Sequence, residues 1–261
     1  MKNSQLKYPV LFIGHGSPSN INADNAFTRD MAKLQPQLPD PEAILVISAH
    51  WLTKGTKITS GSSPGQIYDF YGFPKELYDV VYKAPGSVEI AQRIIDSVGS
   101  YLITPDMQRG IDHAAWAILK HIYPEQKIPV LELSLDMEKE PASHFELGKK
   151  LAVLRRKGVL VIGSGNLVHN LYEVDLNDNA PPFQWAQEFD EIIRNSLLAK
   201  DFDRLINYTL LGKNAMRSVP TSEHYLPMLY TMGMISENET ISFVHESIQN
   251  ASVSMRSFIF G

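Results

Sequence analysis

Short runs of consecutive apolar residues recur along the chain, and they predict buried strands. Four of them span residues 9–13, 43–48, 128–134 and 158–162. They are continuous rather than alternating, which is typical of strands that are covered on both faces. Outer strands of the same sheet are predicted over 57–60, 80–82, 241–244 and 252–260.

Amphipathic segments between these runs predict helices, over 87–98 and 185–198. Ser143 and Glu146 form a capping-box pattern that opens a helix ending at Gly158. Asp112 is predicted to be the N-cap of a helix over 113–123. Strands that alternate with helices predict a layered α/β fold.

Composition narrows the function classes. The 261 residues show no repeat and no long linker, so one domain over 1–261 is predicted. The net charge of −5 comes with no basic patch, and nucleic acid is not an expected partner. The absence of cysteine excludes disulfides, iron–sulfur clusters and thiolate zinc sites. Residues 1–8 form no apolar signal core and no run is long enough to cross a bilayer, so we expect a cytoplasmic protein without a membrane partner.

Histidines supply the candidate chemistry. His15, His50 and His169 each follow a predicted strand, and His113 and His224 lie at predicted helix starts. Ligands of parallel α/β sheets bind beyond the carboxyl ends of the strands. Neutral imidazole is a good ligand for zinc, copper, iron and nickel. Position alone therefore predicts a histidine-rich metal or acid–base site.

The other three histidines are expected to be structural. His121 lies late in a predicted helix, His144 in the first turn of a surface helix, and His245 in a late strand.

An ordered set of short motifs resembles the class III extradiol ring-cleavage dioxygenases, and most of all their DOPA 4,5-dioxygenase branch, which includes bacterial members. The motifs are His15-Gly16-Ser17-Pro18, Ser48-Ala49-His50-Trp51, Asp112-His113, Gly165-Asn166-Leu167-Val168-His169-Asn170-Leu171 and Glu223-His224-Tyr225-Leu226-Pro227. The likeness covers nearly the whole chain in the same order. It implies a mixed, mostly parallel sheet flanked by helices, of the phosphorylase/hydrolase-like type.

The resemblance also implies roles for the histidines. His15, His50 and His224 would be metal ligands. His169 would be the catalytic acid–base group near the metal, or a fourth ligand when substrate is absent. His113 would be a second catalytic group, facing bound oxygen or substrate.

The implied reaction joins a small aromatic catechol with O2 at one divalent metal. Fe(II) is expected for turnover, and Zn(II) is an alternative occupant. More distant relatives use two histidines and one carboxylate, and Glu223 is next to His224. Adjacent helical residues point in different directions, so we prefer His224 as the third ligand. Among the proton carriers, His169 suits a base, because an imidazole titrates near neutrality. Neutral His113, at a helix start, could donate a hydrogen bond to bound oxygen.

An aromatic segment over 68–74 is a candidate wall for the substrate pocket. Tyr68, Phe70 and also Trp51 are candidate substrate contacts, and packing onto the core is an equal alternative for all three. A carboxylate on the substrate would need a cationic anchor, for which Arg109 and Arg217 are the candidates.

Three other interpretations remain open at this stage. A zinc-dependent hydrolase could use the same histidines, although no HExxH motif is present. The segment 61–65 fits GxSxG with Ser63 as nucleophile, but a loop-like sequence follows where a nucleophile elbow needs a helix. A metal-binding or partner-binding protein without turnover is the third. The oligomeric state is not predicted.

Overall fold

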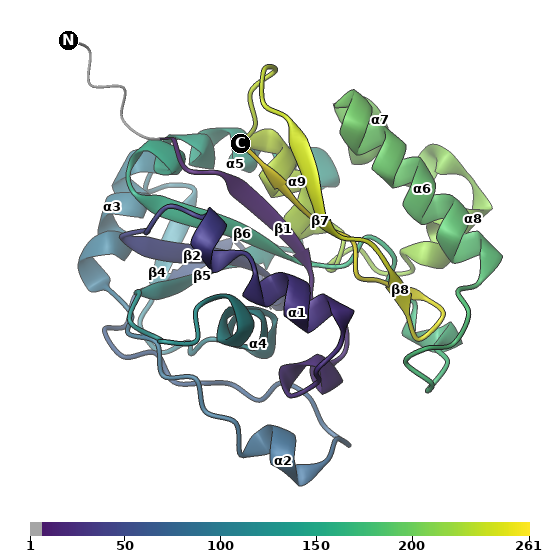
Figure 1. Ribbon diagram of the computed structural model, residues 1–261. Helices are drawn as coiled ribbons and strands as arrows, with labels where there is room; N and C mark the ends of the chain where they lie inside the picture. The colour runs from purple at the N-terminus through teal and green to yellow at the C-terminus, as the bar shows by residue number, and fades with distance from the viewer. Residues whose placement is uncertain (1–6) are drawn as a thin grey trace.

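The computed structural model describes residues 7–261, and a large mixed sheet forms its centre (Figure 1). The order of its eight strands is β4-β3-β5-β2-β6-β1-β10-β7. Their bounds are β1 Val10–Gly14, β2 Ala43–Thr53, β3 Thr56–Thr59, β4 Ile103–Asp106, β5 Val130–Asp136, β6 Val159–Gly165, β7 Ile241–His245 and β10 Ser257–Phe260. A separate pair consists of β8 (Ile248–Gln249) and β9 (Val253–Ser254).

The four predicted apolar runs become the central strands β1, β2, β5 and β6. Each pairs in parallel with its neighbour among these four. Strand β3 is antiparallel to β5, and β10 and β7 continue the sheet in antiparallel pairing on the other side. The predicted mixed, mostly parallel α/β sheet is confirmed.

Helices cover both faces of the sheet, as predicted for continuous apolar strands (Figure 1). One face carries α1 and α4, whose side chains share a core with alternate residues of the central strands. The opposite core includes residues of α3, α5, α6 and α9. The α-helix bounds are α1 Ala26–Ala32, α2 Lys75–Tyr78, α3 Val88–Val98, α4 His113–Ile122, α5 Pro141–Leu151, α6 Gln184–Ala199, α7 Phe202–Ile206, α8 Lys213–Ser218 and α9 Leu226–Gly233. Short 3-10 segments are η1 Pro18–Ile21, η2 Gln35–Gln37, η3 Ala152–Arg156, η4 Leu171–Glu173 and η5 Tyr208–Leu211.

Two predictions at the margins of the sheet are wrong, and one strand was missed. The segment 80–82 is not a strand, because side chains satisfy its backbone: Tyr68 donates to the carbonyl of Val80, and Gln66 accepts from the amide of Tyr82. The segment 252–260 is divided, and only its end joins the large sheet. The edge strand β4 was not predicted.

Helix starts were predicted with mixed success. Asp112 is the N-cap of α4, where its side chain accepts from the amide of Ala114, as expected. The capping box at Ser143 is wrong, since α5 begins at Pro141 after Glu140 and has no side-chain cap. His144 is in the first turn of α5 as predicted, but it is buried and bonded to the hydroxyl of Tyr230 rather than lying on the surface.

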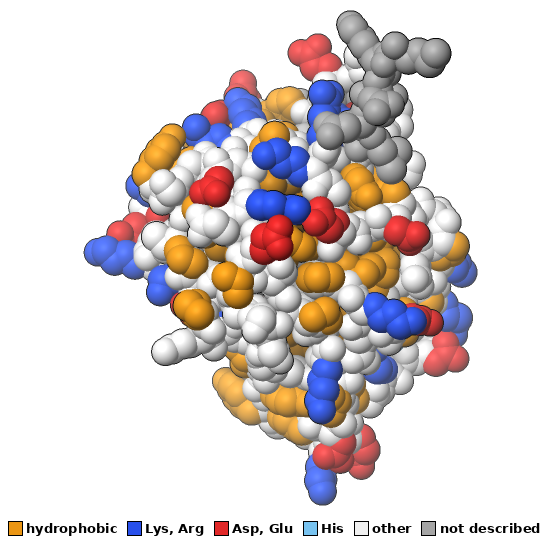
Figure 2. Space-filling view, turned by 90° about the vertical axis from the view of Figure 1, so that its left-hand side faces the viewer, with side chains coloured by type: hydrophobic (Ala, Val, Ile, Leu, Met, Phe, Trp, Pro, Cys, Tyr) orange, Lys and Arg blue, Asp and Glu red, His pale blue; other side chains and the backbone are white. Residues whose placement is uncertain are grey.

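The prediction that residues 1–8 form no apolar signal core falls mostly on residues 1–6, which lie outside the described part of the chain. Across residues 7–261, no helix combines the length and the apolar character that a membrane span requires. The face shown in Figure 2 carries both acidic and basic side chains among scattered hydrophobic ones.

A buried arginine joins the two ends of the described chain. Arg155 is fully buried; it donates to the carbonyls of Tyr8 and Met234 and pairs with both carboxylate oxygens of Glu239. Burial would raise the pKa of Glu239, but hydrogen bonds from Arg155, from the backbone of Ser236 and from Lys7 lower it to about 2.

Glu239→Gln is therefore expected to lower the free energy of unfolding by about 3 kcal/mol at neutral pH, since it leaves a buried cation without its partner. Because the folded pKa lies below the ordinary 4.5, the stabilisation is present above about pH 4.5 and is lost as the pH falls toward 2. Urea unfolding at several pH values measures this. An equal loss of stability at pH 7 and at pH 3 would contradict the ion-pair explanation.

Candidate metal centre

The sheet brings the predicted histidines to one edge. His15 directly follows β1, His50 lies in the carboxyl-terminal part of β2, and His169 follows β6. His113 is the first residue of α4, and His224 lies in the turn before α9. The carboxyl ends of parallel strands meet at one edge, which is why residues far apart in sequence converge here.

A glycine permits the approach of His224. A Cβ atom on Gly165 would lie 2.1 Å from the carbonyl oxygen of His224, so only glycine fits at the end of β6. The same carbonyl accepts a hydrogen bond from the amide of Asn166 at 2.9 Å. This contact fixes the turn that carries His224 against the end of the sheet.

The five histidine rings form a single cluster. The ring centroids of His50 and His113 are 4.3 Å apart, and those of His15 and His50 are 5.0 Å apart. The rings of His169 and His224 stack at 3.5 Å with an angle of 11° between them. The Nε2 atoms of His50 and His224 are 3.2 Å apart and link the two parts of the cluster.

Two sets of donor atoms are close enough to share an ion. The donor nitrogens of His15, His50 and His113 lie within 4.8 Å of one another. The donor atoms of His169, Glu223 and His224 satisfy the same limit. The cluster therefore offers more ligands than one ion needs.

Asp69 orients two of the rings. Its Oδ2 lies 2.6 Å from Nδ1 of His50, and its Oδ1 lies 2.9 Å both from Nδ1 and from the backbone nitrogen of His113. Burial would raise the pKa of Asp69, but hydrogen bonds from His113 and His50 hold it well below its ordinary value. An anionic Asp69 accepts from both Nδ1–H groups, which leaves a lone pair on each Nε2.

His15 and His224 are held in the same tautomer. Nδ1 of His15 lies 3.0 Å from Oγ of Ser164, which donates its own hydrogen to the carbonyl of Ala114 and so accepts from His15. Nδ1 of His224 lies 3.3 Å from a carboxylate oxygen of Glu223. Metal-ligating histidines are usually oriented in this way, by a second acceptor on the far nitrogen.

The electrostatics favour a bound cation. Burial, with further repulsion from neighbouring histidines, lowers the pKa of His15 and of His224 well below the ordinary value, which keeps both rings neutral. Burial would lower the pKa of His50, but its hydrogen bond to Asp69 and the charges of nearby carboxylates raise it. The Nε2 atoms of His50 and His224 are 3.2 Å apart, a contact that either a hydrogen on His50 or a bound cation satisfies. Two nitrogens bound to one tetrahedral ion at 2.0–2.1 Å are about 3.3 Å apart. The donor set fits a metal ion.

His169 differs from the other four rings. Within residues 7–261 its ring accepts or donates no hydrogen bond, while its backbone is fixed by a bond from its amide to the carbonyl of Ser218 at 2.8 Å. Burial, followed by the charge of His50, lowers the pKa of His169 to about 4. A neutral ring without a fixed tautomer is able to accept a proton and to return it.

Buried charges lie beneath the cluster. Asp112 is fully buried, and its carboxylate accepts from Ser48 Oγ at 2.9 Å and from Arg109 at 2.8 Å. Ser48 Oγ in turn accepts from the amide of His50 at 3.1 Å. Glu132 accepts from the amide of Asp112, and burial raises its pKa well above the ordinary value. This network fixes the backbone of His50 and the start of α4.

A cavity of about 480 Å³ opens over the histidines. Its apolar lining consists of Pro18, Phe70, Tyr71, Phe73, Leu171, Val174, Leu176 and Val253. Phe70 thus lies where a substrate contact was predicted. Tyr68 packs its ring against Phe70 and Trp116 outside the lining, and Trp51 is buried beneath the guanidinium of Arg109.

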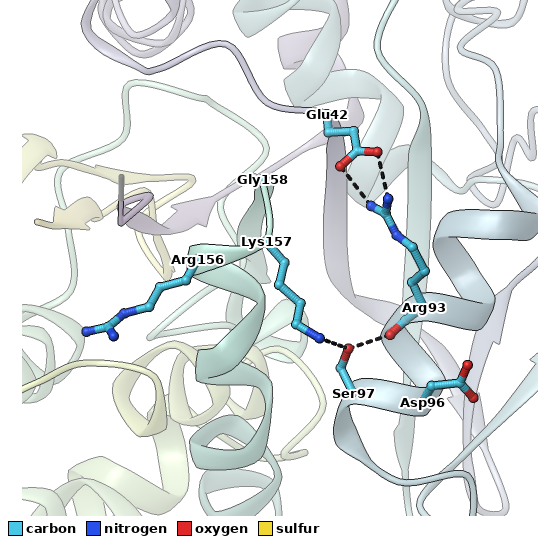
Figure 3. Close-up of a pocket in the computed structure, with 7 residues that line it drawn as sticks. All are labelled: Glu42, Arg93, Asp96, Ser97, Arg156, Lys157 and Gly158. Carbon is cyan, nitrogen blue, oxygen red and sulfur yellow. Dashed lines mark hydrogen bonds and ion pairs between the residues drawn. The ribbon is translucent and has the colours of Figure 1, made fainter. Parts of the chain in front are cut away.

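A second hollow, of about 630 Å³, lies at the opposite edge of the sheet (Figure 3). Its residues include Glu42 and Gly158, which directly precede β2 and β6. Glu42 is paired with Arg93 through two hydrogen bonds, and Lys157 donates to Ser97. Two of its charged side chains, Glu42 and Arg93, are thus engaged with each other, and the hollow lies at the end of the strands opposite the histidines. The GxSxG segment also lies apart, in a loop, and no helix begins between it and Lys75.

Asp69 and Ser164 were not predicted from the sequence as partners of the histidines. Asp69 is the single acidic residue within the aromatic segment 68–74, and Ser164 lies between two glycines at the end of an apolar run. A polar residue in such surroundings is a usable signal, but its partner is visible only in the folded chain.

Comparisons with known proteins agree with this geometry. Residues 10–261 match the family described as the catalytic LigB subunit of aromatic ring-opening dioxygenase. The chain is 43% identical to the 4,5-DOPA dioxygenase extradiol of Escherichia coli, over 99% of this chain and 96% of that protein. It is 34% identical to the Beta vulgaris protein of the same name, over 96% of each. A crystal structure of an uncharacterised Escherichia coli K12 protein superposes with a TM-score of 0.85 at 40% identity, covering 97% of this chain and 100% of that one.

Proposed function

The chain belongs to the LigB family of aromatic ring-opening dioxygenases, and from this membership we propose that it opens the ring of a catechol such as DOPA at one histidine-bound Fe(II) ion. The observation that carries the proposal is the cluster of histidine nitrogens close enough to share an ion, in which Nε2 of His50 and Nε2 of His224 are 3.2 Å apart. The resemblance found in the sequence to extradiol dioxygenases is confirmed by the family match. A zinc-dependent hydrolase is not favoured by any of these relatives.

His15, His50 and His224 are the proposed ligands. The nitrogen spacing between His50 and His224 supports this choice, as does the acceptor that each of the three rings finds for its far nitrogen. A non-haem metal is used throughout the family, and Fe(II), unlike Zn(II), can supply the redox chemistry that O2 requires.

His169 is the proposed base. Its neutral ring borders the same cavity and has both nitrogens free of partners within residues 7–261, so it can take a proton from a catechol hydroxyl. His113 donates its Nδ1 hydrogen to the carboxylate of Asp69, which leaves a lone pair at Nε2. In this tautomer it accepts a hydrogen bond from a bound group, and donation to bound oxygen, as expected from the sequence, requires the protonated ring.

The cavity supports an aromatic substrate. Phe70, Tyr71 and Phe73 supply ring faces next to the histidines, which suits a flat catechol. We further propose that the whole chain, residues 1–261, is one catalytic domain, which the family match over residues 10–261 supports.

Anaerobic reconstitution with Fe(II) or with Zn(II), followed by O2 and either L-DOPA or caffeate, tests the proposal. A yellow product that appears only with Fe(II) is expected, because ring opening gives a conjugated semialdehyde. No colour across a panel of catechols, in a protein that binds one metal ion tightly, would overturn the proposal and favour the hydrolase.

Asp69→Asn is expected to weaken metal binding ten- to hundredfold, the usual cost of losing the partner of a metal-bound histidine. Each carboxylate oxygen of Asp69 accepts from one histidine, His50 or His113. The side-chain amide of asparagine has a single, uncharged oxygen, so it can accept from only one of them in this way. Competition with a chromogenic chelator measures the affinity. Asp79→Asn, an exposed position nearby, is the control that should bind metal normally. Equal affinity for the wild type and Asp69→Asn would rule out the orienting role.

A further inference from the structure

Apart from the histidines, the charged side chains that line the cavity are all acidic. Among the residues that line it, the charged side chains other than histidine are Asp69 and Asp178. Both oxygens of Asp69 are engaged by His50 and His113. Asp178 is exposed at the cavity, and its Oδ1 accepts from the side-chain amide of Asn250 at 3.0 Å. Its Oδ2 makes no hydrogen bond within residues 7–261, so it can receive a ligand.

Neither arginine that the sequence offered as an anchor lines this cavity. Arg109 pairs with Asp112 beneath the site and lies over the ring of Trp51. Arg217 pairs with Glu173 and lies over the ring of Trp185. A substrate carboxylate would therefore meet no lysine or arginine side chain among the lining residues of the described chain.

Two neutral hydrogen-bond donors at the cavity are engaged with other groups of the protein. The side-chain amide of Asn250 donates to the carbonyl of Asp175 and to Asp178. The hydroxyl of Ser17 donates to that of Ser19 at 3.2 Å. A carboxylate that enters the cavity would lose water and gain hydrogen bonds only from neutral groups such as the hydroxyls of Ser19 and Tyr71, without a lysine or arginine to offset that loss.

A cationic group would meet the opposite situation. Asp178 offers a free carboxylate oxygen, and the rings of Tyr71 and Phe73 line the same cavity. Aromatic faces attract ammonium groups through the ring quadrupole. Tyr71 is 90% exposed, so its ring is accessible to a ligand.

We propose that this cavity selects catechols whose side chain ends in an ammonium group, bound by Asp178, over catechols whose side chain ends in a carboxylate. The inference rests on the proposed function, because it treats the cavity as the catechol site. It extends that function by naming the part of a DOPA-like substrate that is recognised: the amine, and not the acid.

Three catechols with side chains of similar length test the charge preference: dopamine, 3,4-dihydroxyphenylpropionate and 4-propylcatechol. Their dissociation constants are measured on the Fe(II)-loaded protein without O2, and kcat/KM is measured after O2 is admitted. We expect dopamine to have a dissociation constant about tenfold lower than the propionate and a kcat/KM about tenfold higher, since attraction of one probe and repulsion of the other add. The neutral catechol should lie between them.

Two variants connect the preference to one side chain. Asp178→Asn keeps the acceptor for Asn250 and should reduce the preference for dopamine over the propionate, in affinity and in kcat/KM, to about twofold. Asp178→Lys should reverse the preference. Asp175→Asn, a change of the same kind in the same loop, lies outside the lining and should keep the wild-type ratio.

The outcomes separate the two proposals. Tighter binding of the propionate, or an unchanged ratio in Asp178→Asn, would overturn the charge preference. If 4-propylcatechol and the other probes bind but none is opened, the proposed function fails, while the dissociation constants still decide the preference.

Discussion

His224→Ala is expected to lose its metal, whereas His113→Ala should keep it. The rings of His224 and His113 both lie beside that of His50. Removing one ring at a time therefore tests which of the two is the third metal ligand together with His15 and His50. The affinity of His224→Ala should fall by more than about hundredfold, beyond the usual cost of losing an outer partner. Metal content after dialysis, measured by mass spectrometry, gives the answer, and circular dichroism confirms that both variants are folded.

Turnover adds a second readout to this pair of variants. His113→Ala should retain one metal ion per chain and still turn over more slowly, because a group that borders the cavity is missing. If His113→Ala were metal-free and His224→Ala were fully loaded, the ligand set would be His15, His50 and His113. The donor atoms of those three lie within 4.8 Å of one another, so the structure accommodates that set as well.

His169→Ala is expected to lower kcat by about 10²–10⁴, the usual contribution of a positioned acid–base group. Metal content should stay at the wild-type level, because the ring of His169 lacks the second acceptor that orients the four other rings. Steady-state O2 uptake and metal analysis of the same preparation measure the two effects separately.

His121→Gln is the matched control for His169→Ala. His121 lies on α4 and bonds the carbonyl of Asn20 at 2.9 Å, a bond that the amide of glutamine can replace. This variant should keep kcat within about twofold of the wild type. If His169→Ala instead lost its metal, or kept its kcat, the assignment of His169 as a base that is not a ligand would be wrong.

The central part of the fold was predictable because its signals are local. Each of the four parallel strands is a continuous apolar run, and such runs bury well on both faces. Strand β4 was missed because Ile103 is its one buried residue and Pro105 interrupts the pattern, both features of an edge strand. The segment 80–82 has strand-like composition, but side chains of Gln66 and Tyr68 bind its backbone in place of a neighbouring strand.

The site was predictable as far as its histidines, and less so for what orients them. His15, His50 and His169 follow apolar strands, so their convergence follows from the rule for parallel sheets. Asp69 lies in an aromatic loop with no periodic pattern, and its bonds to two histidines depend on how that loop folds back. The charge of the cavity likewise depends on loop placement, which brings Asp178 to its lining and keeps the arginines away.

The central claim is that this chain inserts O2 into a catechol ring at its histidine cluster. The most direct measurement is the O2 consumed and the product mass formed by the Fe(II)-loaded protein with L-DOPA. One O2 consumed per catechol is the predicted result, with a product heavier than the substrate by the mass of one O2 molecule, or by that mass less one water where the amine of L-DOPA closes onto a new carbonyl group. Consumption of the catechol without O2 uptake, or a product that has gained only water, would contradict it.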